Sequence, residues 1–185
     1  MEKLQRHFQD QLDILSEKVL VMGGLVEETI GNVVSALVGR DSSLAQRVIR
    51  DDERVDRFDL EIDQLGMEIL GLHQPVARDL RFVITAMKIT NDLDRIADLC
   101  TNVAERAIEL NAEPQLKPFI DIPLMARRAQ QMVRGALDAF VERDAAAARA
   151  VIAMDDELDD RTEQVFANCS RSCPKTRKRR RARFA

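Results

Sequence analysis

A chain of 185 residues can form one domain or two small ones, and 45% hydrophobic and 32% charged residues with neither Tyr nor Trp favour long amphipathic helices over sheets. Eight Lys and Arg but no acidic residue follow residue 167, so the remainder carries a net charge of −12, which argues against nucleic acid as a partner. The longest apolar run, residues 19–26, is too short for a membrane span, and no signal peptide is recognisable. The three cysteines do not indicate a disulfide scaffold, so a cytoplasmic location is expected.

The first expected helix covers residues 3–38. Its apolar residues recur at steps of three and four, from Phe8 to Leu37, and Gly39 marks its end. Gly23 and Gly24 lie inside this stripe, where small residues allow a neighbouring helix to approach closely.

Two more helices are expected at residues 43–73 and 78–110. Pro75 separates them, because the residue before a proline is driven out of the helical region. Short connections make consecutive helices antiparallel neighbours, so residues 1–110 are predicted to form a complete three-helix bundle. The side chains predicted to be buried in it are Leu15, Val26, Phe58, Leu65, Ile89, Ile96 and Val103.

The chain then repeats itself. After a proline-containing linker, expected at residues 111–123, a shift of 103 residues aligns the second part with the first without a gap. The matched pairs are Met22 and Met125, Ala36 and Ala139, Arg40-Asp41 and Arg143-Asp144, Ala45 and Ala148, Val48-Ile49 and Val151-Ile152, Asp52 and Asp155, and Asp56 and Asp159.

This second copy is expected to be partial. Helices are predicted at about residues 119–142 and 145–167, within a unit at 124–167, whereas a third helix would have to begin near residue 181. The fold class is therefore all-α: tandem three-helix bundles, with the second bundle lacking its third helix. The apolar period stops after Phe166, and residues 168–185 form a basic tail, interpreted as non-native after a frameshift or truncation, or alternatively as a contact for nucleic acid or anionic lipid.

Carboxylates at helical spacing form the candidate binding site. Asp94, Asp98, Asn102 and Glu105 share one face of the third helix, away from the apolar stripe. Such a set of oxygen donors can hold a cation, particularly if a neighbouring helix adds more. The second helix offers Asp52 and Asp56 at a four-residue spacing, which Asp155 and Asp159 repeat in the second copy. The alternative is a solvated acidic surface paired with Arg95 and Arg106.

Catalytic chemistry has little support in the sequence. The two histidines, His7 and His73, do not belong to a Glu-x-x-His pattern, and neither a glycine-rich phosphate loop nor a nucleophile with a basic partner is evident. The protein is therefore predicted not to be an enzyme. Two readings stay open beside a metal-binding adaptor: a structural helical-bundle interaction protein without a metal site, and, with the least support, a metalloenzyme.

Four segments in this order resemble the PhoU family, the accessory proteins of phosphate-specific transport: residues 21–27 (VMGGLVE), 41–49 (DSSLAQRVI), 74–81 (QPVARDLR) and 93–98 (LDRIAD). The resemblance covers residues 1 to about 167. It implies two similar three-helix bundles and a negative regulator of phosphate uptake and phosphate metabolism. It also implies contacts with the ATPase subunit of the phosphate ABC transporter and with a phosphate-sensing histidine kinase, homodimers, and membrane association only through these partners.

The same resemblance implies a metal cluster. The family motif of Glu or Asp followed four residues later by Asp matches Asp94 and Asp98, although Asp replaces the usual Glu at 94 and Ala97 replaces the usual Gly. The metal expected is a divalent or trivalent ion or cluster: iron, zinc, manganese or magnesium. The second metal motif of the family would lie on the third helix of the second copy.

Overall fold

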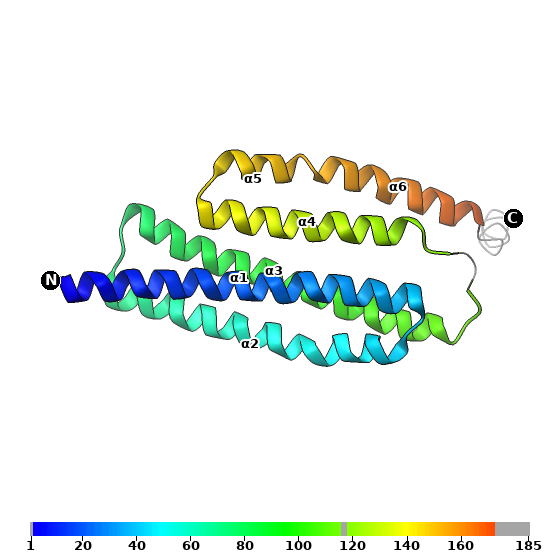
Figure 1. Cartoon of the computed structure of the whole chain (residues 1–185), viewed down its shortest axis with the longest axis horizontal. Coiled ribbons are helices and arrows are strands. Elements are labelled where there is room, and N and C mark those ends of the chain that lie inside the picture. The colour runs from blue at the N-terminus through cyan, green and yellow to red at the C-terminus, as the bar shows by residue number, and fades with distance from the viewer. Residues whose placement is uncertain (1, 116–117, 173–185) are drawn as a thin grey trace, which may run out of the picture.

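The computed structural model describes residues 2–115 and 118–172, which contain helices and no strands. The described residues form six helices, and Figure 1 shows them arranged along one long axis. In chain order they are α1 (Glu2–Gly39), α2 (Ser42–His73), α3 (Ala77–Asn111), α4 (Asp121–Glu142), α5 (Ala145–Ile152) and α6 (Asp155–Ser172). The all-α class is therefore confirmed.

The first three helices form the predicted antiparallel bundle, with ends within one residue of those expected. The α2 helix starts where its N-cap, Asp41, accepts hydrogen bonds from the backbone N–H groups of Ser43 and Leu44, both at 2.9 Å. It ends at His73, and its C-cap Gln74, with a left-handed backbone (φ 45°), precedes Pro75 and turns the chain toward α3.

The core of this bundle is well buried, but the set of α3 side chains that it buries differs from the prediction. Leu15 and Val26 are fully buried as predicted, whereas Phe58, Leu65, Ile89 and Ile96 are only half-buried and Val103 is 38% exposed. The α3 helix instead buries smaller residues one position further along: Thr90, Ala97 and Ala104. Small side chains bring α3 close to its neighbours, so the larger ones flank the contact instead of filling it.

The second copy differs from the first in its second helix. A single helix was predicted over residues 145–167, but the structure breaks it at Ala153 and Met154 into α5 and α6. Three acidic residues, Asp155, Asp156 and Glu157, open α6, and acidic side chains are favourable in the first turn of a helix.

The expected segment boundaries also shift. The α4 helix, Asp121–Glu142, agrees with the helix expected at about residues 119–142 and overlaps the end of the stretch expected as a linker; it holds Pro123 in its first turn, where a proline is tolerated. The α6 helix runs to Ser172, past the expected start of the basic tail at residue 168. Residues 173–185, most of that tail, lie outside the described residues.

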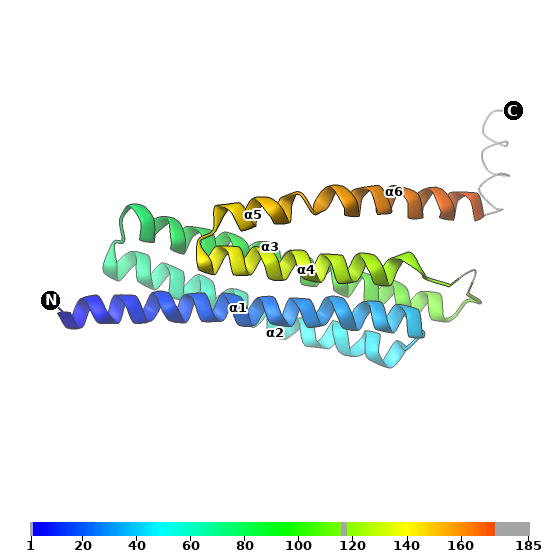
Figure 2. The ribbon, with the colours of Figure 1, turned by 45° about the horizontal axis from the view of Figure 1, so that its top comes forward.

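The second copy is attached to the first through α1 and α4. Both views place α4 between α1 and the α5–α6 pair (Figure 2). The predicted close approach occurs at Gly23, because a Cβ atom there would meet Leu137 Cδ1 at 2.0 Å, while Gly24 faces open space. Nearby, the Gln130 side chain donates to the Glu27 carbonyl oxygen at 2.7 Å and Arg134 pairs with the Glu27 carboxylate at 2.6 Å.

The α1 helix also has the length and hydropathy of a membrane span over Arg6–Gly39. A core helix of a soluble bundle passes the same test, and here the large side chains Leu15, Val19, Met22 and Val26 are fully enclosed by the bundle. Packing accounts for part of the apolar character of α1, whereas Ile14, Leu20, Val21 and Val38 on the same helix are exposed.

Candidate functional site

The predicted carboxylates of α2 and α3 come together along the line where the two helices meet. We call Asp52, Asp56 and Asp59 of α2 with Asp94 and Asp98 of α3 the carboxylate seam. Helical spacing puts the three α2 residues on one face at steps of four and three. The α2 and α3 helices pack antiparallel, so this face lies beside the face of α3 that carries Asp94 and Asp98.

The electrostatics of the seam show that its members act on one another. Burial is the main cause of the raised pKa of the Asp94 carboxyl, and Asp59, Asp98, Asp56 and Asp52 raise it further. The pKa of Asp52 is raised by burial and then by Asp56 and Asp98, against an opposing effect of the Thr101 hydroxyl, which lowers it. Within residues 2–115 and 118–172, none of the five carboxylates forms an ion pair, so the seam is a concentration of uncompensated negative charge.

Asp59 belongs to the seam although the sequence analysis did not single it out. Its pKa is raised by burial and then by Asp63 and Asp56. Asp59 and Asp63 also line a cavity of about 200 Å³ at this end of the seam, together with Met87, Thr90 and Asn91. The continuation of the Asp52–Asp56 spacing to Asp59 and Asp63 is the signal that would have found them.

The other two predicted α3 donors are placed less favourably. Asn102 and Glu105 are exposed, as Asp56 and Asp98 of the seam also are, but neither contributes to the raised pKa of a seam carboxyl. Glu105 instead raises the pKa of Arg106, after the larger effect of Glu109, with which Arg106 pairs at 2.6 Å. No ion pair of Arg95 or Arg106 with the seam is found among the described residues. Asp56 and Asp98 are exposed, as the alternative of a solvated acidic surface expects.

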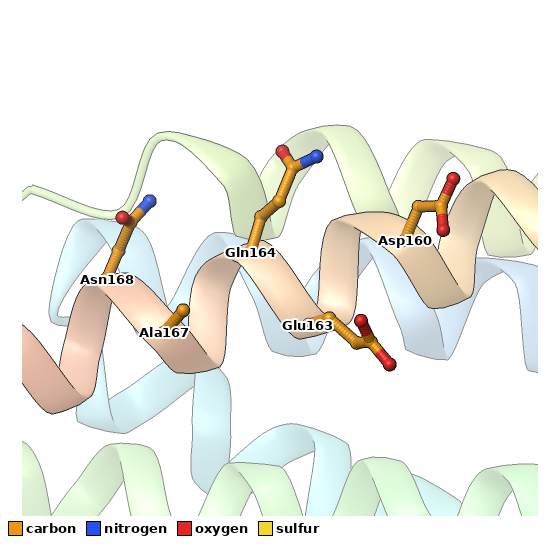
Figure 3. A pocket seen from close by; sticks show the side chains of 5 residues that line it. All are labelled: Asp160, Glu163, Gln164, Ala167 and Asn168. Carbon is orange, nitrogen blue, oxygen red and sulfur yellow. The ribbon is translucent and has the colours of Figure 1, made fainter.

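The repeated pair on the second copy lacks a facing helix. Asp155 and Asp159 are exposed on α6, and no described helix meets them as α3 meets Asp52 and Asp56. A shallow hollow of about 620 Å³ follows the same helix, lined by Asp160, Glu163, Gln164, Ala167 and Asn168. In Figure 3 Asp160 and Glu163 point to different sides of α6, so these two carboxylates do not converge.

The seam has the chemistry of a hard-cation site without the finished geometry of one. All its donors are oxygens, and the hydroxyl of Thr101 beside Asp52 is buried without a hydrogen bond of regular geometry. Among the described residues no three His, Cys, Asp or Glu side chains already converge on one point. A cation would therefore have to draw side chains of the seam inward, which is within the reach of an aspartate rotamer change.

The sulfur of Cys100 does not extend this site. Cys100 is buried on α3, and burial, with a smaller effect of Asp52, raises its pKa to about 11. A thiol with such a pKa stays protonated at neutral pH when no cation is bound. The seam as defined contains oxygen donors.

Comparisons with known proteins address the whole chain. The family model described as PhoU domain matches residues 19–107 and 122–185. The second match includes residues 168–185, which the sequence analysis placed outside the resemblance. A Thermotoga maritima protein named phosphate-specific transport system accessory protein PhoU homolog 2 is 35% identical over 162 residues, covering 88% of this chain and 69% of that protein. The corresponding Aquifex aeolicus homolog is 36% identical over 155 residues, covering 84% and 70%.

Solved structures agree with this similarity. The crystal structure of PhoU from Pseudomonas aeruginosa superposes with a TM-score of 0.82 at 35% identity, covering 87% of this chain and 78% of that one. The phosphate transport system regulatory protein PhoU from Streptococcus pneumoniae gives a TM-score of 0.76 at 26% identity, covering 83% and 72%. The fold and the sequence thus point to the same family.

Proposed function

The chain belongs to the PhoU family, and on this premise we propose that it is a non-catalytic accessory protein of a phosphate-specific transport system. The observation that carries the proposal is the agreement of sequence and fold with the P. aeruginosa protein over 87% of this chain. The seam supports a binding role over a catalytic one, because among the described residues its carboxylates form no ion pair with a basic side chain.

The finer role we propose is negative regulation of phosphate uptake in the cytoplasm. In this role the protein contacts the ATPase subunit of the transporter and a phosphate-sensing histidine kinase, and reaches the membrane only through them. An elongated, all-helical molecule with separate surfaces on its two copies suits two simultaneous contacts. We also expect a homodimer, for which the exposed Ile152 and Phe166 on α5 and α6 provide apolar surface.

A bound cation is the third part of the proposal. Five aspartates without counter-charges repel one another. A cation between α2 and α3 would neutralise this repulsion and link the two helices through shared ligands. Oxygen-only ligands suit magnesium, manganese or ferric iron better than zinc, which prefers nitrogen and sulfur. Asp94 and Asp98 would hold the ion from α3, with Asp52, Asp56 and Asp59 completing the set from α2.

The cation proposal is tested by titrating the purified full chain with Mn²⁺ and Mg²⁺ in a calorimeter and by measuring its metal content. We expect wild type to bind and the double variant Asp94→Asn/Asp98→Asn to lose binding. The matched control is Asp51→Asn/Asp92→Asn, which removes two exposed charges from the same helices outside the seam. Equal metal content in wild type and the seam variant would instead favour the structural bundle without a metal site.

The regulatory proposal is tested in cells that lack their own family member and carry a phosphate-starvation reporter. We expect the chain to restore repression of the reporter in phosphate-rich medium. Continued high reporter activity, with the protein present at normal level, would contradict a negative regulatory role. The seam variant in the same cells then shows whether repression needs the cation site.

A further inference from the structure

The two histidines of the chain lie side by side at one end of the first bundle. His7 is in the second turn of α1, and His73 is the last residue of α2, far away in the sequence. Because α1 and α2 pack antiparallel, the start of one meets the end of the other (Figure 1). The two imidazole rings therefore come together, with their centroids 5.8 Å apart. This pair shares no residue with the carboxylate seam.

A buried glutamine holds His73 in place. Gln11 lies one helical turn after His7 on α1 and is only 6% exposed, although its side chain is polar. Its amide contacts two side chains of α2. The amide nitrogen donates to Glu68 Oε1 at 3.3 Å, and the amide oxygen lies 2.6 Å from His73 Nε2. A buried amide with a partner on each side has a fixed orientation.

These two contacts decide which nitrogen of His73 carries the hydrogen. An ionised carboxylate only accepts hydrogen bonds, so the atom of Gln11 that faces Glu68 is the amide nitrogen. The atom that faces His73 is then the amide oxygen, which also only accepts, so His73 Nε2 donates to it. In the neutral ring the lone pair is therefore on Nδ1.

The surroundings of His73 are those of a ligand held ready. Histidines that bind metals usually donate one ring N–H to a protein oxygen, which fixes the ring and leaves the other nitrogen for the metal. Gln11 supplies that oxygen. Phe8 packs against the His73 ring, with centroids 5.0 Å apart, and restrains it further. His73 is half-buried and His7 is exposed, so an ion can reach the pair from solvent.

The separation of the rings suits a shared ion. Zinc binds an imidazole nitrogen at about 2.0–2.1 Å, so two rings on one tetrahedral zinc ion have centroids about 5–6 Å apart. The observed 5.8 Å lies in this range, and small rotamer changes of the exposed His7 can turn one of its nitrogens toward His73 Nδ1. Among the described residues no third His, Cys, Asp or Glu converges with the pair, so water completes the coordination.

We propose that His7 and His73 form a two-histidine zinc site that links the start of α1 to the end of α2. Gln11 is a positioning residue, because it presents His73 Nδ1 without touching the ion. Nitrogen donors favour zinc over magnesium and manganese, so this ion differs from the one expected at the carboxylate seam. The site does not depend on the regulatory role proposed above.

The test follows the imidazole nitrogens of the full, nitrogen-15-labelled chain by NMR while Zn²⁺ is added in the presence of excess Mg²⁺. The chain has two histidines, so only two rings contribute. Without zinc, His73 is expected to carry its hydrogen on Nε2. Zinc is expected to shift His73 Nδ1 and one nitrogen of His7. The seam variant Asp94→Asn/Asp98→Asn should give the same shifts, which separates this site from the carboxylate seam.

Substitutions measure how much each residue contributes. His7→Asn should lower the zinc affinity read from the His73 ring by at least about tenfold, and this exposed change leaves the bundle core intact. Gln11→Met should cost about tenfold and should also give a mixture of the two His73 tautomers. Gln9→Ala, an exposed change in the same turn of α1, is the matched control and should bind zinc as wild type does.

Three results would each overturn the proposal. The first is that zinc leaves the ring nitrogens of both histidines unshifted. The second is equal zinc affinity of wild type and His7→Asn, because His73 would then act without its neighbour. The third is a His73 ring that carries its hydrogen on Nδ1 in the wild type, since the nitrogen assigned to zinc would then be blocked.

Discussion

The two copies of the repeated unit share a backbone plan but differ in how much core they enclose. In the first copy three helices surround a stripe of fully buried side chains, among them Leu15, Met22 and Ile62. In the second, α4 buries Leu137 and Ala139, and no residue of α5 is buried. Similar sequences thus give similar turns and caps, whereas burial differs because, among the described residues, a third helix covers the apolar stripe of the first copy only.

The largest expected difference between the copies is in local opening. Amide protons of α2 and α3 should exchange only through global unfolding, whereas those of α5 and α6 should exchange at least about a hundredfold faster through local opening. Hydrogen exchange followed by mass spectrometry at several protein concentrations measures this. Equal, concentration-independent protection of both copies in a monomer would show that the second copy is self-sufficient. Protection that rises with concentration would show that another chain covers it.

A matched pair of core substitutions sharpens the comparison. Met22 is fully buried, and its counterpart Met125 is half-buried. Met22→Ala should lower the free energy of unfolding by about 2–5 kcal/mol, because it leaves a cavity in a packed core. Met125→Ala should cost about 1 kcal/mol. Urea titration followed by circular dichroism gives both values, and equal losses would mean that the two cores are equally packed.

The contact that joins the copies can be broken at one glycine. Gly23→Ala should destabilise the α1–α4 contact by about 1–3 kcal/mol, because the new methyl group overlaps the buried side chain of Leu137. The effect should appear as faster exchange in α4, with α2 and α3 unchanged. Gly24→Ala, which faces open space, is the control and should stabilise α1 slightly through helix propensity. Identical behaviour of the two variants would remove the argument for close approach at Gly23.

The smallest effect expected is on the pH dependence of the first copy. Because the pKa of Asp94 is raised in the folded state, the folded state binds that proton more tightly than the unfolded state. This contribution to stability is present below the unfolded pKa and is lost as pH rises through the folded pKa. Without divalent cations, Asp94→Asn should therefore raise Tm slightly at pH 7 and leave it unchanged in strong acid. If the seam binds Mn²⁺, then at saturating Mn²⁺ Asp94→Asn should instead lower Tm, since only the wild type is stabilised by the bound ion.

Sequence patterns predicted the elements well where the signal is local. Helix ends followed from Gly39, Asp41 and Pro75, because caps and breakers act within one turn. The same patterns placed Val103 in the core and missed Ala104, because apolar periodicity tells which side of a helix faces inward but not how near the neighbouring helix lies. The break at Ala153 and Met154 also escaped prediction, since the corresponding stretch of the first copy is continuous.

The candidate site was predictable in part for the same reason. Spacing identified Asp94 and Asp98 on one helix and Asp52 and Asp56 on another, and the structure brings these two pairs to one seam. Glu105 follows the same helical spacing but lies exposed beyond the seam. The extent of the seam is set by how far the two helices face each other, which is a property of the packed pair and not of either sequence segment.

The Arg40 guanidinium donates hydrogen bonds to the carbonyl oxygens of Leu110, Asn111 and Glu113, and these bonds bear on the order in which the first copy folds. They join residues 70 to 73 positions apart, so closing them requires α2 and α3 to have been formed and returned to the start of α2. Contacts that close so long a loop carry a high entropic cost and tend to form late. Removing them with Arg40→Ala should therefore speed unfolding and leave the folding rate nearly unchanged. Arg40 therefore lowers the unfolding rate, so it contributes to the lifetime of the folded bundle more than to its folding rate.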